Sequence, residues 1–214
     1  MLKSLFIDMQ QFIEGLAHTG LKRALRKALF INQLVIPVVK NLEKIAPSIS
    51  VSANLDVSFI SISHKMLPQL EYAYRVKSRR LKAKRNANYG LSGFAVVSRK
   101  TIIGDIWYTT WKTSRHPHLH EDIDLLFLDP GPKDVYMFDL FVEPGERGKN
   151  IALPLMRHAL FQLSELGYKN VFGYFNAQYV PALWVHRILK FKELDGVLLS
   201  RFFFKRFSRK QFNK

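Results

Sequence analysis

The feature that most restricts the fold is a strand–loop–helix unit at residues 135–166. Val135 to Val142 is an apolar run rich in β-branched and aromatic residues, which predicts a buried strand. Residues 143–150 are polar and contain one proline and two glycines. Ile151 to Leu166 then shows apolar residues at three- and four-residue steps until Gly167. A strand that leads through a short loop into a helix predicts a sheet whose faces are covered by helices.

The chain from residue 55 onwards continues this pattern of short strands and helices. Alternation predicts a strand at 55–66, where Val57, Phe59 and Ile62 lie in a serine-rich stretch. The remaining predicted elements are strands at 94–98, 102–111, 171–175, 191–194 and 197–204, helices at 68–85 and 181–189, and a long polar loop at 112–134. The order, β-α-β-β-β-α-β-α-β-β, mixes hairpins with crossovers. We therefore predict an α/β (α+β) fold with a mixed, mostly antiparallel sheet flanked by helices.

Residues 1–46 differ from the rest because apolar residues recur there at helical spacing. Gly20 separates two predicted helices, and Pro37 is expected to kink or end the second. These assignments divide the chain into an N-terminal helical extension at 1–50, a sheet-containing domain at 51–207 and a basic tail at 208–214.

The charge of the chain is strongly unbalanced. It carries 33 Lys and Arg residues against 17 Asp and Glu, which gives a formal net charge of +16. An excess this large predicts attraction to an anionic partner: nucleic acid, an anionic membrane surface, an acidic carrier protein or a phosphate-rich cofactor. Because no helix-turn-helix, zinc-finger or aromatic RNA-binding motif is present, nucleic acid is the least expected of the four.

The chain contains no cysteine, which excludes disulfides, thiolate zinc sites and cysteine nucleophiles. It has no apolar run of about 18 residues or more, so no transmembrane helix is predicted. The N-terminus carries Lys3, Asp8 and Glu14 and lacks a small-residue cleavage site, so it is a poor signal peptide. We expect a cytoplasmic protein, with peripheral attachment to the inner membrane face as a second option.

Residues 142–152 have the composition of an anion site. The N-terminus of a helix presents unpaired backbone N–H groups and the positive end of the helix dipole. Gly148 permits close approach of the backbone, and Arg147 and Lys149 add positive charge. The alternative is an ordinary β-to-α turn with solvated basic residues, because short glycine loops are common.

This segment resembles the signature of the GNAT superfamily of acyltransferases, Arg/Gln-x-x-Gly-x-Gly/Ala after the fourth strand. Arg147 matches the first position and Ala152 the last, and the Val-x-Pro lead-in matches at Val142 and Pro144. Asn150 replaces the middle glycine. Asparagine tolerates a positive φ better than other non-glycine residues, so the loop is still expected to form, with weaker or altered cofactor binding.

Three further segments resemble the same superfamily. Ile103-Gly104-Asp105 resembles the hydrophobic–Gly step of its third strand, and Asn176 resembles an asparagine often found at the end of its fifth. Residues 182–191 resemble a motif that usually reads Ala-x-x-x-Tyr-x-x-x-Gly-Phe, with His186 in place of the tyrosine and Lys190 in place of the glycine. The resemblance covers residues 55–204 and implies that 51–207 is a GNAT-like acyltransferase domain.

The resemblance also implies a donor site for acetyl-CoA or another acyl-CoA between the fourth and fifth strands, which splay apart in this superfamily. The backbone of Leu140, Phe141 and Val142 would bind the pantetheine and polarise the thioester carbonyl. The pyrophosphate and the rest of the cofactor would be held by Arg147, Gly148, Lys149, Asn150, Ile151, Ala152 and Asn176.

Transfer to an amine calls for a base at the amine and an acid at the leaving thiolate. His186 occupies the superfamily's usual acid position, and an imidazolium can donate a proton. The alternative is a helix residue near the surface with no catalytic role. Asp139, on an apolar strand, is the candidate base. Its alternative is a buried structural carboxylate paired with an arginine or a backbone donor.

A histidine-rich loop offers a separate candidate. His116, His118 and His120 alternate beside Glu121 and Asp122, and such a set can bind zinc. The intervening proline and the loop context favour a solvated loop near the acceptor site, so we predict no metal site.

Three functional hypotheses follow. The first is a GNAT enzyme that moves an acyl group, expected to be acetyl, from acyl-CoA to a small-molecule amine by direct attack. The second is a long-chain N-acyltransferase that uses an acyl-carrier protein thioester to make N-acyl amino acids or lipids. The missing loop glycine, the basic surface and the apolar N-terminus motivate it. The third is a non-catalytic, membrane-associated protein on a GNAT scaffold. The acceptor and the oligomeric state stay open.

Overall fold

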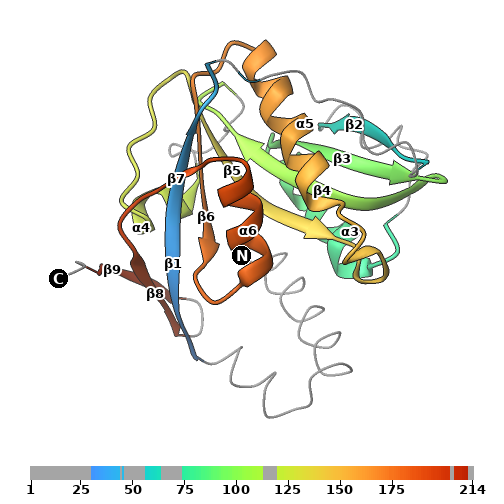
Figure 1. Ribbon diagram of the computed structural model, residues 1–214. Helices are drawn as coiled ribbons and strands as arrows, with labels where there is room; N and C mark the ends of the chain where they lie inside the picture. The colour runs from blue at the N-terminus through green and yellow to red at the C-terminus, as the bar shows by residue number, and fades with distance from the viewer. Residues whose placement is uncertain are drawn as a thin grey trace.

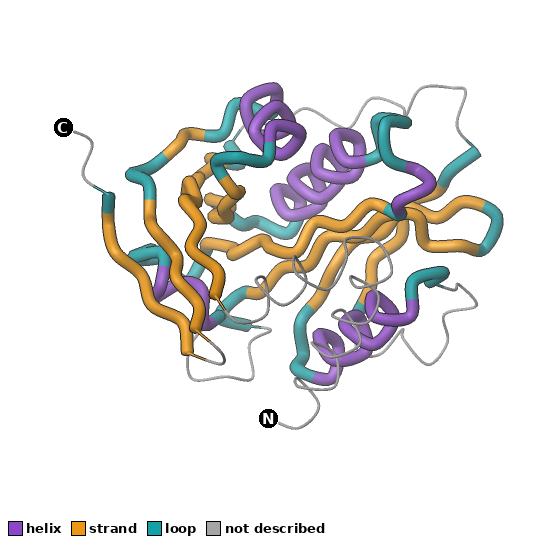
Figure 2. Tube along the Cα trace, turned by 90° about the horizontal axis from the view of Figure 1, so that it is seen from below, coloured by secondary structure: helices purple, strands orange, loops and turns teal. Residues whose placement is uncertain are grey.

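The computed structural model describes residues 30–43, 45, 56–63, 74–112, 120–202 and 205–211. In these residues one nine-stranded sheet runs through the molecule, and helices lie on both of its faces (Figure 1, Figure 2). The strands are β1 (Phe30–Asn41), β2 (Ser58–Ile62), β3 (Ser92–Ser98), β4 (Thr101–Thr109), β5 (Asp134–Val142), β6 (Asn170–Asn176), β7 (Lys192–Glu193), β8 (Val197–Phe202) and β9 (Lys205–Lys210). The helices are α3 (Lys77–Asn88), α4 (Glu121–Leu125), the 3₁₀ turn η2 (Pro144–Glu146), α5 (Ala152–Glu165) and α6 (Val180–Ile188).

The strand order is β2-β3-β4-β5-β6-β1-β8-β9, and β7 pairs with β1. In the described sheet, β5 and β6 run parallel and the other pairs are antiparallel. The predicted fold class, a mixed and mostly antiparallel sheet flanked by helices, is therefore confirmed.

Alternating residues of the central strands build separate cores on the two faces of the sheet. On one face, α5 buries Leu155 and Leu163 completely, and α6 packs into the same core. On the other face, Ala83 of α3 packs with the fully buried Trp107, and α4 packs against Tyr136. The helices α5 and α6 thus cover one face of the sheet, and α3 and α4 cover the other.

Residues 30–41 correct the predicted N-terminal helix: they form β1, which lies between β6 and β8. Val35 and Val38, three residues apart, are fully buried in cores on opposite faces. A helix would put them on one face, so the spacing that suggested a helix belongs to a strand buried on both sides.

Pro37 is tolerated in the middle of β1 because of where it lies. Its carbonyl accepts from the N–H of Leu194 at 2.8 Å, so its nitrogen faces the same edge. At this point β1 has left its last β8 partner, opposite Val35, and begins to pair with β7 at Val38. The ring therefore sits at a break in the ladder, where proline is permitted.

Two further predictions were wrong. The polar loop at 112–134 contains the helix α4, and the basic tail predicted from residue 208 begins inside β9, which pairs with β8. Both elements are short, and ion pairs join them: Arg206 of β9 contacts Glu121 at 2.8 Å and Asp122 at 2.6 Å. Contacts between distant segments therefore stabilise them, and local periodicity does not reveal such contacts.

The other predicted strands and helices are confirmed within a few residues, except that the helix predicted from residue 68 is described only as α3. Residues 1–29, 64–73 and 113–119 lie outside the described residues, so the N-terminal helices and the histidines at 116 and 118 are not placed. Among the helices that the structure describes, none is long and apolar enough to cross a membrane.

Candidate functional site

The candidate site begins where β5 and β6 separate. These parallel strands pair only at Asp134 with Asn170, Val135 with Val171 and Tyr136 with Phe172. Beyond Tyr136, β6 continues along β1 and β5 continues along β4. The two strands therefore diverge towards their carboxyl ends and leave the inner edge of β5 without a strand partner, as the sequence resemblance implied.

A β-bulge lies in β5 directly after this divergence. Trp107 of β4 pairs with Phe138 and Asp105 pairs with Phe141, so Asp139 and Leu140 together oppose one residue of β4. Asp139 takes a left-handed backbone with φ of +61°. A bulge of this kind turns the following backbone groups away from the regular ladder. Here those groups are the ones of Leu140 to Val142, which were predicted to contact pantetheine.

The bulge is held by Arg79 of α3. Its guanidinium donates to the Asp139 carboxylate at 2.7 Å and to the Asp139 backbone carbonyl at 2.8 Å. Lys82, one turn later on the same helix, donates to the other carboxylate oxygen at 2.8 Å. The Arg79 guanidinium also lies 4.8 Å from the centre of the Phe141 ring. One helix thus fixes the backbone, the carboxylate and an aromatic neighbour of the bulge.

A second carboxylate completes this buried cluster. Asp105 of β4 is fully buried and accepts two hydrogen bonds from Arg79, one of them from Nε at 3.1 Å. The Tyr74 hydroxyl donates to Asp105 at 2.6 Å. Arg79 is only 5 % exposed and Asp105 is fully buried, so these two charges are withdrawn from water together, whereas Asp139 is partly exposed. Such charges are tolerated when each is paired and hydrogen-bonded, as here.

The position of Asp139 favours the structural alternative over the base. Burial opposes ionisation of this carboxyl, but the adjacent Arg79 and Lys82 charges outweigh burial and hold its pKa below the ordinary value. A carboxylate with a lowered pKa and two cationic partners is a weak proton acceptor. Its observed contacts are those of a group that shapes the bulge.

His186 is a buried residue of α6, only 8 % exposed, and not a surface residue. Its ring lies 5.0 Å from the ring of Phe175 and 5.0 Å from that of Phe191. Nδ1 lies 2.7 Å from the carbonyl oxygen of Ala182 and must donate to it. Burial lowers the pKa of His186, which favours the neutral ring. The proton is then on Nδ1 and Nε2 is an acceptor, so the predicted role as an imidazolium acid is not favoured.

The loop after β5 has left-handed backbone at the two positions that the sequence motif singles out. Gly148 has φ of +84° and Asn150 has φ of +56°. The prediction that Asn150 takes a positive φ in place of glycine is confirmed. In this described loop, no side chain caps the N-terminus of α5. The first N–H groups of α5 are therefore available to an anion, apart from position 154, where proline has none.

The charged residues of the loop and a glycine of β4 complete this anion site. Arg147 is exposed, and its Nε donates to the Val142 carbonyl at 3.3 Å; Lys149 pairs with Glu146 at 2.9 Å. A Cβ on Gly104 would lie 3.2 Å from both Ile151 and the Phe141 carbonyl. The absence of a side chain there lets the start of α5 approach the sheet. These residues fit a pyrophosphate.

Asn176 lies at the end of β6, beside β1. Its amide donates to the side chain of Gln33 at 3.0 Å, and its side-chain oxygen accepts from the N–H of Gln178 at 2.9 Å. The structure thus places the predicted cofactor residues of β5 and the loop along one strand–loop–helix unit, whereas Asn176 belongs to the facing strand and bonds within the protein.

Sequence reasoning missed the inward role of Arg79, because basic side chains on a helix usually face solvent. The signal was present: Arg79, Ala83 and Ala87 are four residues apart, and the two alanines mark the buried face. Tyr74 and the pairing of Asp105 depend on contacts between distant segments and had no local signal.

His120 is the member of the histidine loop that the structure describes. Its Nδ1 accepts from the N–H of Asp122 at 3.2 Å, and its ring lies 4.4 Å from that of Phe138. Among the described residues, no group of three or more side chains could hold a metal ion. His120 therefore caps α4 instead of acting as part of a described ligand set.

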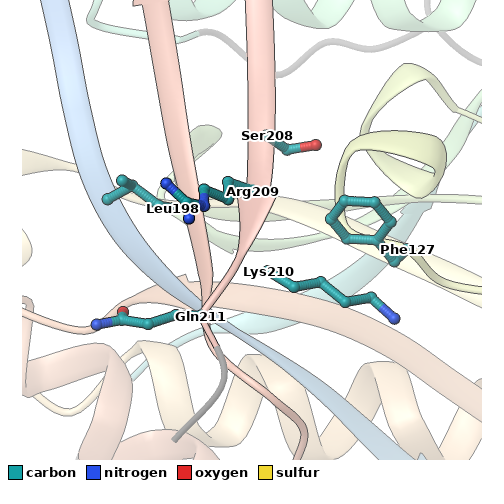
Figure 3. Close-up of a pocket in the computed structure, with 6 residues that line it drawn as sticks. All are labelled: Phe127, Leu198, Ser208, Arg209, Lys210 and Gln211. Atoms are coloured by element: carbon teal, nitrogen blue, oxygen red, sulfur yellow. The ribbon is translucent and has the colours of Figure 1, made fainter.

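A separate hollow lies at the far edge of the sheet. It has a volume of about 640 Å³ and is lined by Phe127, Leu198, Ser208, Arg209, Lys210 and Gln211 (Figure 3). β9 is separated from β6 by β8 and β1, and none of the predicted site residues lines this hollow. We therefore do not assign the candidate site to it.

Comparisons with known proteins agree on the fold. No family model and no curated protein matches the chain. Among solved structures, a GCN5-related N-acetyltransferase from Sphaerobacter thermophilus is 10% identical with a TM-score of 0.51, covering 90% of this chain and 56% of that one. A GCN5-related glucosamine N-acetyltransferase region of a fungal multi-domain β-N-acetylglucosaminidase is 15% identical with a TM-score of 0.52, covering 85% and 22%.

The chain therefore spans about half or less of the length of these solved proteins. At such low identity the likeness shows that the chain has a GNAT fold, and it leaves the reaction to be argued from the site.

Proposed function

We propose that this protein transfers an acyl group from acyl-CoA, with acetyl as the expected group, to an amine. The observation that carries the proposal is one continuous unit: β5 diverges from β6, bulges at Asp139, and leads through a loop into the uncapped N-terminus of α5. The unit offers backbone groups to an extended chain at one end and N–H donors to a diphosphate at the other. Coenzyme A carries both chemical features, and when bound it supplies the activated thioester.

The chain's own contribution is mainly positioning. The N–H groups at the start of α5, with Arg147 and Lys149, bind the pyrophosphate through charge and hydrogen bonds. The edge of β5 at Leu140 to Val142 orients the pantetheine, and Arg79 fixes this edge through the Asp139 carbonyl. Held in this way, the cofactor would present its thioester carbonyl carbon to the amine nitrogen. A C–N bond would replace the C–S bond, and the proton that the amine loses would balance the proton that the leaving thiolate gains.

Thermal unfolding with and without ligand tests the proposal. CoA and acetyl-CoA should raise the melting temperature of the full chain, because a ligand that binds only the folded state stabilises it. Arg147→Glu should weaken this shift. Arg157→Glu makes the same change of charge at an exposed position of α5 beyond the loop and should leave the shift unchanged. Equal shifts in both variants would contradict the assigned loop.

The length of the acyl chain is a separate question that the same assay answers. Stabilisation by acetyl-CoA supports the first hypothesis and justifies a screen of amine acceptors. Stabilisation by octanoyl-CoA and palmitoyl-CoA alone would favour a long-chain donor, including one carried by an acyl-carrier protein. The absence of a shift with every CoA thioester would contradict acyl-CoA as the donor.

A further inference from the structure

Helix α6 carries a row of apolar side chains on its outer surface. Val180, Trp184 and Ile188 follow one another at four-residue spacing and are 54 %, 61 % and 49 % exposed. Residues four apart lie on one face of a helix, and Tyr179, immediately before the helix, is 55 % exposed. We call these four residues the α6 row.

Exposed large apolar side chains are clustered in the α6 row and scattered elsewhere. The described residues include nine exposed large apolar side chains, and four of them lie in these ten consecutive positions. The other five lie singly on other segments: Tyr89, Trp111, Phe127, Leu166 and Phe207. Single exposed apolar residues are ordinary, but a contiguous row indicates an interaction surface.

The inner face of α6 prevents the helix from rotating to bury this row. His186 is buried between the rings of Phe175 and Phe191, and its Nδ1–H is bonded to Ala182. Leu183 and Val185 pack against the same core. The helix is therefore fixed with the α6 row facing outwards.

Cations outnumber acids beside the row. Residues 166–192 contain no Asp or Glu. Arg187 in α6, Lys190 after it and Lys192 in β7 are exposed, and two exposed acids, Glu193 and Asp195, follow them. Arg187 pairs with Glu193 at 3.0 Å and is still 58 % exposed. The excess of cations, together with the net charge of +16, favours a partner that is apolar where it meets the row and anionic beside it.

We infer that the α6 row inserts into the headgroup region of an anionic lipid bilayer, while Arg187, Lys190 and Lys192 contact the lipid phosphates. An amphipathic helix with aromatic residues on its apolar side and cations beside it is suited to a lipid interface. Trp and Tyr are favoured there because each has an apolar ring and a polar atom. The row is also a ridge, and a deformable bilayer accepts a ridge without a preformed groove. This inference is independent of the proposed acyl transfer.

Co-sedimentation of the full chain with vesicles tests the inference. We expect binding to vesicles of mixed phosphatidylglycerol and phosphatidylcholine and little binding to phosphatidylcholine alone. The double variant Trp184→Ser, Ile188→Ser should lower the partition coefficient about tenfold or more, because binding scales with buried apolar area. The matched variant Trp111→Ser, Leu166→Ser removes equally exposed side chains elsewhere and should bind like the parent.

Fluorescence provides a measurement that needs no change in the row. The chain has three tryptophans, of which Trp107 is fully buried, so a Trp111→Phe variant leaves Trp184 as the exposed reporter. Its emission should shift to the blue when anionic vesicles are added and should not shift with neutral ones. Thermal unfolding checks that each variant is folded.

Three results would overturn the inference. If both double variants lose binding equally or keep it equally, the net charge of +16 accounts for the attraction without the row. If Trp184 emits as a buried residue before vesicles are added, another segment of this chain or a second copy covers the row. If CoA alone shifts its emission, the row belongs to the cofactor site.

Discussion

The loop that follows β5 and the cluster that holds β5 contribute to the same site in contrasting ways. The loop is exposed and formed by consecutive residues, so its motif could be recognised in the sequence. Gly148 and Asn150 take left-handed backbone, and Arg147 and Lys149 face solvent. The cluster around Arg79 is buried and joins α3, β4 and β5, which are distant in sequence. The comparison teaches that the residues that would touch a ligand follow a motif, whereas those that shape the strand beneath it are set by tertiary contacts.

The largest effect is expected in the cluster. Arg79→Met should destabilise the protein by about 3–5 kcal/mol, because it leaves the buried carboxylate of Asp105 and the half-buried one of Asp139 without their shared partner. Arg80→Met changes the exposed neighbour on the same helix and should cost less than about 0.5 kcal/mol. Denaturant unfolding of both variants measures the difference. A similar small effect in both would mean that the cluster does not stabilise the fold.

The pH dependence of stability tests the charge of Asp139. Its folded pKa is lowered, so its ion pairs stabilise the protein at neutral pH, and this contribution is lost as the pH falls below the unfolded value of about 4. Asp139→Asn should therefore lower stability at pH 7 and flatten its fall under acid conditions. Unfolding free energies measured from pH 7 downwards compare the two proteins. Parallel curves would contradict an ionised, paired Asp139.

The loop should respond in ligand affinity and not in stability. Arg147→Glu should weaken CoA binding about tenfold, as expected for the loss of a charge-assisted contact. Its unfolding without ligand should change little because the side chain is exposed. Titration calorimetry with CoA gives the affinity, and Arg157→Glu is the control. If Arg147→Glu lost as much stability as Arg79→Met, the proposed difference between the loop and the cluster would be contradicted.

The smallest effect is expected when Asn150 is replaced by glycine. Asn150→Gly removes the side chain from a left-handed position and should leave stability and CoA affinity equal or slightly higher. Asn150→Val puts a β-branched residue at the same φ and should cost about 1–3 kcal/mol of loop strain. Thermal unfolding and CoA titration of the two variants test this, since glycine tolerates a positive φ and valine does not. Equal behaviour of Gly and Val would contradict the left-handed loop.

The sequence by itself determined the strand–loop–helix unit at 135–166, because this unit follows from neighbouring residues. The order of the elements predicted the mixed sheet, and the resemblance to a motif with glycine at position 150 implied the left-handed Asn150. The apolar run of β5, the glycine that ends α5 and the conformational tolerance of asparagine act over one or two turns of chain. Tertiary structure alone decided that residues 30–41 form a strand at the centre of the sheet. Their apolar residues fit either period, and pairing with β6 and β8 settles the choice.

The same distinction holds for the candidate catalytic residues. Sequence located His186 and Asp139, but their chemistry depends on partners far away in the chain. Burial against Phe175 and Phe191 favours the neutral form of His186, and the charges of α3 keep Asp139 ionised. A residue's identity is local, whereas its pKa and accessibility arise from the low-dielectric surroundings and charges that the fold assembles around it.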